Sequence, residues 1–264
     1  MRDTIVLQGV PETMLQTLYA RARETRQARP AIRDEKAAEL VERLDYDFSG
    51  AERDKAMRTG VIARTILLDR MCGEFLEAHP GSLVVNLACG LDTRCYRMNG
   101  KYKCWYNLDL PETMAVRARL LPETGEIRQI ACSALDAAWT QEVSAAGEPV
   151  LVIIEGLAMY LQEDEVLQLF ALIRRAFTHA TVLVETMNPF VAAHVKETSI
   201  EGSRAKFTWG IKDGEALQRL LPEYRHVRDV SLTEGMQEFI PLYKLLGKIG
   251  FIRNISNKLL ELSF

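Results

Sequence analysis

The chain has 264 residues, of which 48% are hydrophobic and 26% charged, so it can bury a large core and lacks the composition of a disordered protein. Its formal net charge is −3 and its Lys and Arg residues are dispersed, which disfavours a nucleic-acid partner. Because the apolar runs fall short of the ~20 residues that span a bilayer and the first residues lack a signal-peptide pattern, we expect a cytoplasmic protein without membrane attachment.

The cysteines and histidines do not form a metal-binding pattern. Five cysteines stand at positions 72, 89, 95, 104 and 132, an odd number without a C-x-x-C pair, and the four histidines do not share a metal-ligand spacing. We therefore expect buried free thiols, no disulfide framework and no metal.

The first 80 residues predict helices. Apolar residues recur at helical spacing over 11–28, over 33–44 and from Val61 to Phe75, and His79-Pro80-Gly81 ends the third helix. Residues 45–50 are rich in Asp, Ser and Gly and predict an irregular connection.

From residue 81 onward, strands alternate with helices, which is typical of a parallel sheet covered by helices on both faces. The predicted strands are 83–87, 103–108, 127–131, 150–154 and 181–185, followed by two closing strands at 226–232 and 258–264. Helices are expected near 163–177 and at 213–221. We predict one α/β domain over 1–264, with a helical lid and first helix in 1–80 and an α/β core in 81–264.

The segment with chemical information is the first strand and the turn after it. Residues 84–94 read VVNLACGLDTR, a buried strand that runs into small residues where backbone can approach a ligand closely. Asp109 ends the second strand nineteen residues after Gly90, close to the interval at which an acidic side chain binds ribose hydroxyls in nucleotide-binding α/β units. Together these features predict an adenosine across the first two strands.

The turn itself discriminates between NAD and S-adenosylmethionine (SAM). A dinucleotide site requires G-x-G-x-x-G so that a helix N-terminus can receive a pyrophosphate. This turn has Ala88 in place of one glycine and places the anionic Asp92 where phosphate charge would lie. SAM lacks phosphate and carries a sulfonium, which an acidic site attracts. SAM is therefore the favoured cofactor, and an NAD-dependent oxidoreductase is the alternative.

These motifs resemble the leucine carboxyl methyltransferase family, in its bacterial branch of polyketide-type O-methyltransferases. The similar segments cover most of the chain: residues 13–22, 34–37 and 44–48 in the helical part, then 86–94 with G-L-D-T-R, 107–111 (NLDLP) and 155–161 (EGLAMYL). The resemblance implies the Rossmann-like fold of class I SAM-dependent methyltransferases, with a seven-stranded, mostly parallel sheet.

The resemblance also implies a set of cofactor-binding residues. Lys36 and Arg64 would hold the methionine carboxylate of SAM, and Asp109 would bind the ribose. The remaining implied contacts are Ala88, Cys89 and Gly90 along the methionyl part, Ser133 and Ala134 at the adenine, Glu155 at the end of the fourth strand, and Leu110. Arg94 and Arg97 could steer an anionic acceptor, but we favour a role in bracing Asp92.

The predicted reaction is methyl transfer to an oxygen of a small-molecule acceptor, either a carboxylate or a hydroxyl. A carboxylate is already anionic at neutral pH, whereas a hydroxyl needs a base, for which His194 and Tyr160 are the candidates. The acceptor would enter between the N-terminal helices and residues 188–209, where the apolar and aromatic side chains are Met187, Phe190, Phe207 and Trp209. A SAM-binding module without catalytic activity is a second alternative, and the oligomeric state is open.

Overall fold

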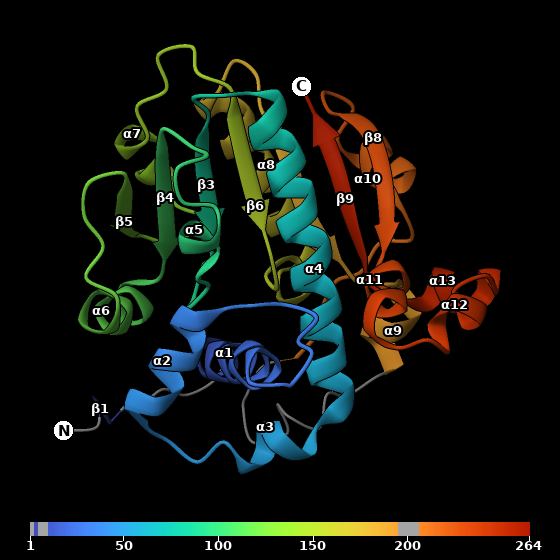
Figure 1. Cartoon of the computed structure of the whole chain (residues 1–264). Coiled ribbons are helices and arrows are strands. Elements are labelled where there is room, and N and C mark those ends of the chain that lie inside the picture. The colour runs from blue at the N-terminus through green and yellow to red at the C-terminus, as the bar shows by residue number, and fades with distance from the viewer. Residues whose placement is uncertain (1–2, 5–9, 195–205) are drawn as a thin grey trace.

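The computed structural model describes residues 3–4, 10–194 and 206–264. Its centre is a seven-stranded sheet of order β5-β4-β3-β6-β7-β9-β8, in which β9 runs in the direction opposite to the other six strands (Figure 1). The strands are β3 (Leu83–Leu87), β4 (Cys104–Asp109), β5 (Ile127–Ala131), β6 (Val150–Ile154), β7 (Thr181–Thr186), β8 (Arg225–Ser231) and β9 (Lys258–Ser263). The seven-stranded, mostly parallel Rossmann-like sheet that the sequence predicts is therefore present.

Helices pack on both faces of this sheet. One face is covered by α4 (Lys55–Ala78), with α5 (Arg94–Arg97) and α11 (Leu232–Phe239) beside it. The other is covered by α7 (Trp139–Glu142), α8 (Glu163–Ala176) and α10 (Gly214–Leu220). Because side chains alternate along a strand, Val84 faces the α4 layer while Val85 faces the α8 layer, and both are fully buried. Burial on both faces explains why the central strand β6 reads as a continuous apolar run.

The N-terminal helices lie at the carboxyl ends of the central strands (Figure 1). They are α1 (Val10–Thr25), α2 (Glu35–Arg43) and α3 (Ser49–Arg53), with a short parallel pair, β1 (Asp3–Thr4) and β2 (Leu44–Asp45). Leu15 and Leu18 of α1 pack with Leu40 of α2 and with Leu91, which follows β3. This satellite core fixes α1 against the loop where β3 ends.

The remaining elements continue these layers. They are α6 (Pro111–Leu120), the 3-10 turn η1 (Ala158–Tyr160), α9 (Pro189–His194), α12 (Tyr243–Leu246) and α13 (Gly250–Ile255). Within the described part of the chain, no helix has both the length and the apolar character required to cross a membrane. Of the five thiols, all but the half-buried Cys132 are buried.

Several predicted boundaries need correction, each for a local reason. Helix α2 begins at Glu35 rather than at residue 33, because the Asp34 side chain caps it by accepting a hydrogen bond from the Ala37 N–H at 3.0 Å. Leu232 belongs to α11 rather than to the strand, because Ser231 caps that helix. Residues 45–50, predicted to be irregular, contribute to β2 and to the start of α3. The predicted wall at 188–209 lies partly outside the described residues.

Candidate functional site

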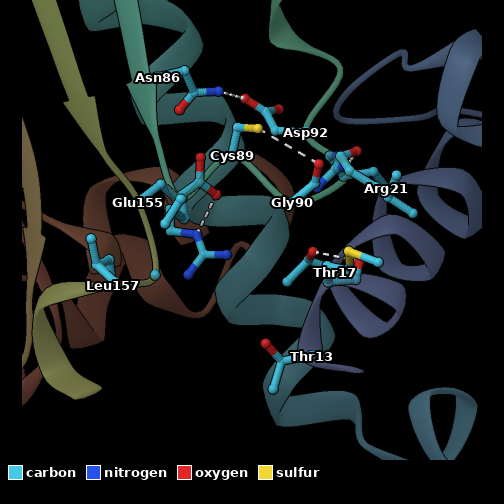
Figure 2. A pocket seen from close by; sticks show the side chains of 14 residues that line it. Thr13, Thr17, Arg21, Asn86, Cys89, Gly90, Asp92, Glu155 and Leu157 are labelled. Carbon is cyan, nitrogen blue, oxygen red and sulfur yellow. Dashed lines mark hydrogen bonds and ion pairs between the residues drawn. The ribbon is translucent and has the colours of Figure 1, made fainter. Parts of the chain in front are cut away.

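A cleft opens where β3 and β6 end and α1 passes over them (Figure 2). It encloses about 620 Å³, open solvent at its mouth included. The lining residues come from α1, α4, the turn after β3 and the loop after β6: Thr13, Met14, Thr17, Arg21, Arg64, Asn86, Ala88, Cys89, Gly90, Leu91, Asp92, Glu155, Gly156 and Leu157. Of the predicted cofactor residues, the structure brings Arg64, Ala88, Cys89, Gly90 and Glu155 together here.

The turn after β3 presents its backbone to the cleft. Ala88 and Gly90 both have left-handed backbone conformations, with φ of 53° and 47°. A Cβ atom at Gly90 would lie 2.9 Å from the Met14 Cβ of α1, so only glycine fits this approach. Such a conformation is unfavourable for Ala88 and persists only because the surrounding contacts fix it.

Asp109 at the end of β4 fixes this turn. One carboxylate oxygen accepts a hydrogen bond from the Gly90 N–H at 2.7 Å, and the other accepts one from the Leu110 N–H at 2.7 Å. Burial raises the pKa of Asp109 above its ordinary value, although both N–H groups lower it. Asp109 therefore adjoins the turn, as predicted from the nineteen-residue interval, and its binding of ribose stays a prediction.

Arginine and glutamate side chains form the polar wall of the cleft. Arg64 of α4 pairs with Glu155 (Nε–Oε1, 2.7 Å) and with Glu185 of β7 (Nη1–Oε2, 2.7 Å). The other oxygen of Glu155 accepts a hydrogen bond from Arg94 Nη2 at 2.9 Å. Burial raises the pKa of Glu155, but the Arg64 and Arg94 guanidiniums lower it by more than burial raises it. The pKa of Glu155 therefore lies below its ordinary value. Glu155 is therefore ionised at neutral pH.

Asp92 is braced by the two arginines that follow it, as the sequence favoured. Arg94 Nη1 lies 2.8 Å from one Asp92 oxygen, and Arg97 Nη2 lies 3.6 Å from the other. The Asn86 amide also donates to Asp92 at 2.9 Å (Figure 2). Burial raises the pKa of Asp92, but the charges of Arg94 and Arg97 lower it by more than burial raises it. The pKa of Asp92 therefore lies well below its ordinary value. With Arg94 only 1% exposed, these arginines are structural parts of the loop.

The other predicted cofactor residues do not line the cleft. Lys36 on α2 pairs with Glu39 at 2.6 Å and lies over the Tyr96 ring. Leu110 follows β4 and is 39% exposed, and Ser133 and Ala134 follow β5, the strand beside β4. Leu110, Ser133 and Ala134 therefore lie along the sheet edge on the Asp109 side of the cleft, where an adenine would extend. Their contacts with the cofactor, and that of Lys36, stay predictions.

Neither candidate base lines the described cleft. His194 ends α9, where it is exposed, stacks on Phe190 and has its Nδ1 2.9 Å from the Phe190 carbonyl oxygen. The Tyr160 ring packs on Phe207 at 5.4 Å between centroids. Met187 and Trp209, proposed as an acceptor wall, are buried and do not line the cleft either.

The sequence analysis did not assign three charged or amide side chains in or directly behind the cleft. Arg21 lines the cleft with its side chain 3% exposed, donating to Asp34 and to the Leu91 carbonyl. Asn86 lies within β3, and Glu185 is the last but one residue of β7. The signal that identified Asp109, an acidic residue at the end of a strand, also applies to Glu185.

Solved structures define the class to which this fold belongs. The chain superposes with a TM-score of 0.51 on magnesium protoporphyrin IX methyltransferase from Synechocystis PCC 6803, solved with S-adenosylhomocysteine (SAH), at 10% identity over 80% of this chain and 87% of that one. The mycolic acid cyclopropane synthase CmaA1 gives the same TM-score, at 11% identity over 98% of this chain and 99% of that one. The fold is that of the class I SAM-dependent methyltransferases.

Sequence comparison places the chain in a family within that class. Residues 14–174 match the leucine carboxyl methyltransferase family. The tetracenomycin polyketide synthesis O-methyltransferase TcmP of Streptomyces glaucescens is 35% identical over 94% of this chain and 93% of its own length. The SAM-dependent methyltransferase dpfgK of Gibberella zeae is 30% identical over 95% and 89%. The protein belongs to the leucine carboxyl methyltransferase family and is a SAM-dependent methyltransferase, which rules out the oxidoreductase alternative.

Proposed function

We propose that the protein transfers the methyl group of SAM to a carboxylate oxygen of a small, largely apolar acid. The observation that carries this proposal is the lack of a competent base among the described residues of the cleft. Asp92 and Glu155 are ion-paired with lowered pKa values, burial raises the pKa of the Cys89 thiol, and no histidine is among the described lining residues. A carboxylate acceptor needs no base, whereas a hydroxyl does.

The polar wall of the cleft suits the amino-acid end of the cofactor. Arg64 would hold the methionine carboxylate, because guanidinium matches a planar carboxylate. Glu155 and the backbone of Ala88–Gly90 would line the rest of that end, and Asp109 would accept the ribose hydroxyls. Gly90 supports this fit, since any side chain there would collide with α1. When bound, SAM supplies a methyl carbon already activated by its sulfonium.

The chain's own contribution is then to orient the acceptor and exclude water. Helix α1 lies over the cleft and contributes Met14, Thr17 and Arg21, so we propose that α1–α3 act as the lid of a single methyltransferase domain. The name of TcmP, a polyketide-synthesis O-methyltransferase, supports a polyketide-like acceptor that is methylated on oxygen.

The proposal is tested by the chemical nature of the product. Purified protein is incubated with methyl-labelled SAM and matched pairs of naphthoic acids and naphthols. We expect label in a methyl ester, which mild alkali releases as methanol. An alkali-stable methyl ether as the main product would instead indicate hydroxyl methylation, and labelled cofactor that binds without any transfer would favour the inactive-module alternative.

The pH profile gives an independent measure. With an acid as acceptor, kcat/KM should be flat from about pH 6 to pH 8, because the carboxylate is ionised throughout. A tenfold rise per pH unit over this range would indicate that a proton must leave before transfer, and would contradict the proposal.

A further inference from the structure

Glu185 connects three elements to the cofactor cleft although its own side chain is 2% exposed. One oxygen is 2.7 Å from Arg64 Nη1 and also accepts the Gly156 N–H at 3.0 Å, and both residues line the cleft. The other oxygen accepts the Asn257 amide at 3.2 Å. Glu185 thus holds a cleft guanidinium and a cleft backbone segment in place from behind.

Glu185 is also the end of a continuous chain of ion pairs among the described residues. Arg21 pairs with Asp34, Arg97 joins Asp34 to Asp69 and Asp92, Arg94 joins Asp69 and Asp92 to Glu155, and Arg64 joins Glu155 to Glu185. With every group ionised, five carboxylates face four guanidiniums, which leaves one negative charge. Arg64, the guanidinium next to Glu185, is shared by two carboxylates.

The charge of the cofactor changes during the reaction. SAM carries a sulfonium, an ammonium and a carboxylate, and is a net cation, whereas SAH lacks the sulfonium and is neutral. A buried site with one excess negative charge attracts a cation over a neutral molecule of nearly the same shape.

We propose that Glu185 is a positioning residue of the cofactor cleft, and that its charge makes the cleft prefer cationic SAM over neutral SAH. This preference would help substrate cofactor to displace product. The inference rests on the use of SAM and not on the identity of the acceptor, so binding measurements test it separately from the proposed carboxylate methylation.

The test is calorimetric titration of the Glu185→Gln variant with SAM and with SAH. Glutamine keeps the size and an oxygen that can accept the Gly156 N–H, but it removes the charge. We expect the Kd for SAM to rise about tenfold and that for SAH to change less than about twofold. If Glu185 had a purely structural role, its substitution would weaken the binding of SAM and SAH equally. An equal rise of both Kd values, or no change in either, overturns the proposal.

Glu261→Gln is the matched control. Glu261 lies on β9, next to β7, is 20% exposed and pairs with Arg228 at 2.6 Å, outside the cleft. The Glu261→Gln substitution removes one negative charge, as Glu185→Gln does. The affinities for SAM and for SAH should both stay at the wild-type value. If Glu185→Gln does not fold, wild-type protein is titrated with a SAM analogue that has an ammonium group in place of the methylsulfonium. Tighter binding of this cation than of SAH supports the proposal, and equal binding refutes it.

Discussion

At the residue scale, the turn after β3 shows how a ligand site imposes an unfavourable backbone. Two residues of this turn, Ala88 and Gly90, are left-handed, with Cys89 between them. Gly90 is held by hydrogen bonds on both of its backbone groups. Asp109 accepts the Gly90 N–H, and the buried Arg117 donates to the Gly90 carbonyl at 2.8 Å. These contacts outweigh the ~1–2 kcal/mol that a left-handed conformation costs an alanine.

Gly90→Ala should therefore destabilise the protein by about 2 kcal/mol or more and weaken SAM binding at least about tenfold, because it combines an unfavourable φ with the collision against Met14. Urea denaturation and calorimetry measure the two effects. Gly125→Ala is the control, since Gly125 has φ of 72° but nothing within 4 Å of the added Cβ. It should lose only about 1 kcal/mol and keep SAM affinity, and equal losses of affinity in the two variants would refute the steric argument.

At the element scale, a buried arginine supplements the apolar packing that holds α1 against the loop after β3. Arg21 Nε lies 2.9 Å from Asp34, and its Nη2 donates to the Leu91 carbonyl at 2.8 Å. Two residues further along the same helix, Arg23 pairs with Glu52, but both side chains are about two-fifths exposed. Helix α1 thus makes one buried and one exposed arginine–carboxylate ion pair, and their contributions to stability can be compared.

Arg21→Ala should lower the free energy of unfolding by about 3 kcal/mol, because it leaves Asp34 buried with fewer partners. Arg23→Ala should change it by no more than about 1 kcal/mol, because water and salt screen an exposed pair. Urea denaturation of both variants at the same pH makes the comparison. If the two losses are equal, Arg21 does not attach α1 in the way the geometry indicates.

At the scale of the whole molecule, the buried carboxylates link stability to pH. The folded-state pKa values of Asp34, Asp92 and Glu155 lie below the unfolded values of 3.8 and 4.5, because neighbouring arginines outweigh the desolvation that raises them. The unfolded chain therefore takes up these protons first as the pH falls. The stabilisation is complete above about pH 5 and is lost below it.

We expect the free energy of unfolding to be nearly constant from pH 7 to pH 5 and then to fall by up to about 4 kcal/mol per pH unit, which corresponds to three extra protons on the unfolded chain. Urea denaturation at pH 3 to 7 measures this slope. The slope should persist in 0.5 M salt, because buried pairs are screened little. A flat profile down to pH 3 would show that these carboxylates are not stabilised in the folded state.

The sequence determined the architecture because the relevant signals are local. Strands β3, β5 and β6 have the predicted bounds. For β3 and β6 the signal is a largely apolar run between turn residues, which is typical of a strand with both faces covered. The same logic located Gly90 and Asp109 at one sheet edge, because parallel strands end together. The turn chemistry also favoured SAM, in agreement with the family to which the chain belongs.

The tertiary structure decided which charged side chains meet. Arg64 from α4, Glu155 after β6 and Glu185 on β7 lie far apart in sequence, and no local spacing specifies that one guanidinium joins both carboxylates. Lys36, to which the resemblance assigns a cofactor contact that stays a prediction, pairs with Glu39 one helical turn away. The packing of whole elements determines which long charged side chains meet. The fold and the cofactor could therefore be predicted from the sequence, but the network of ion pairs around the cleft could not.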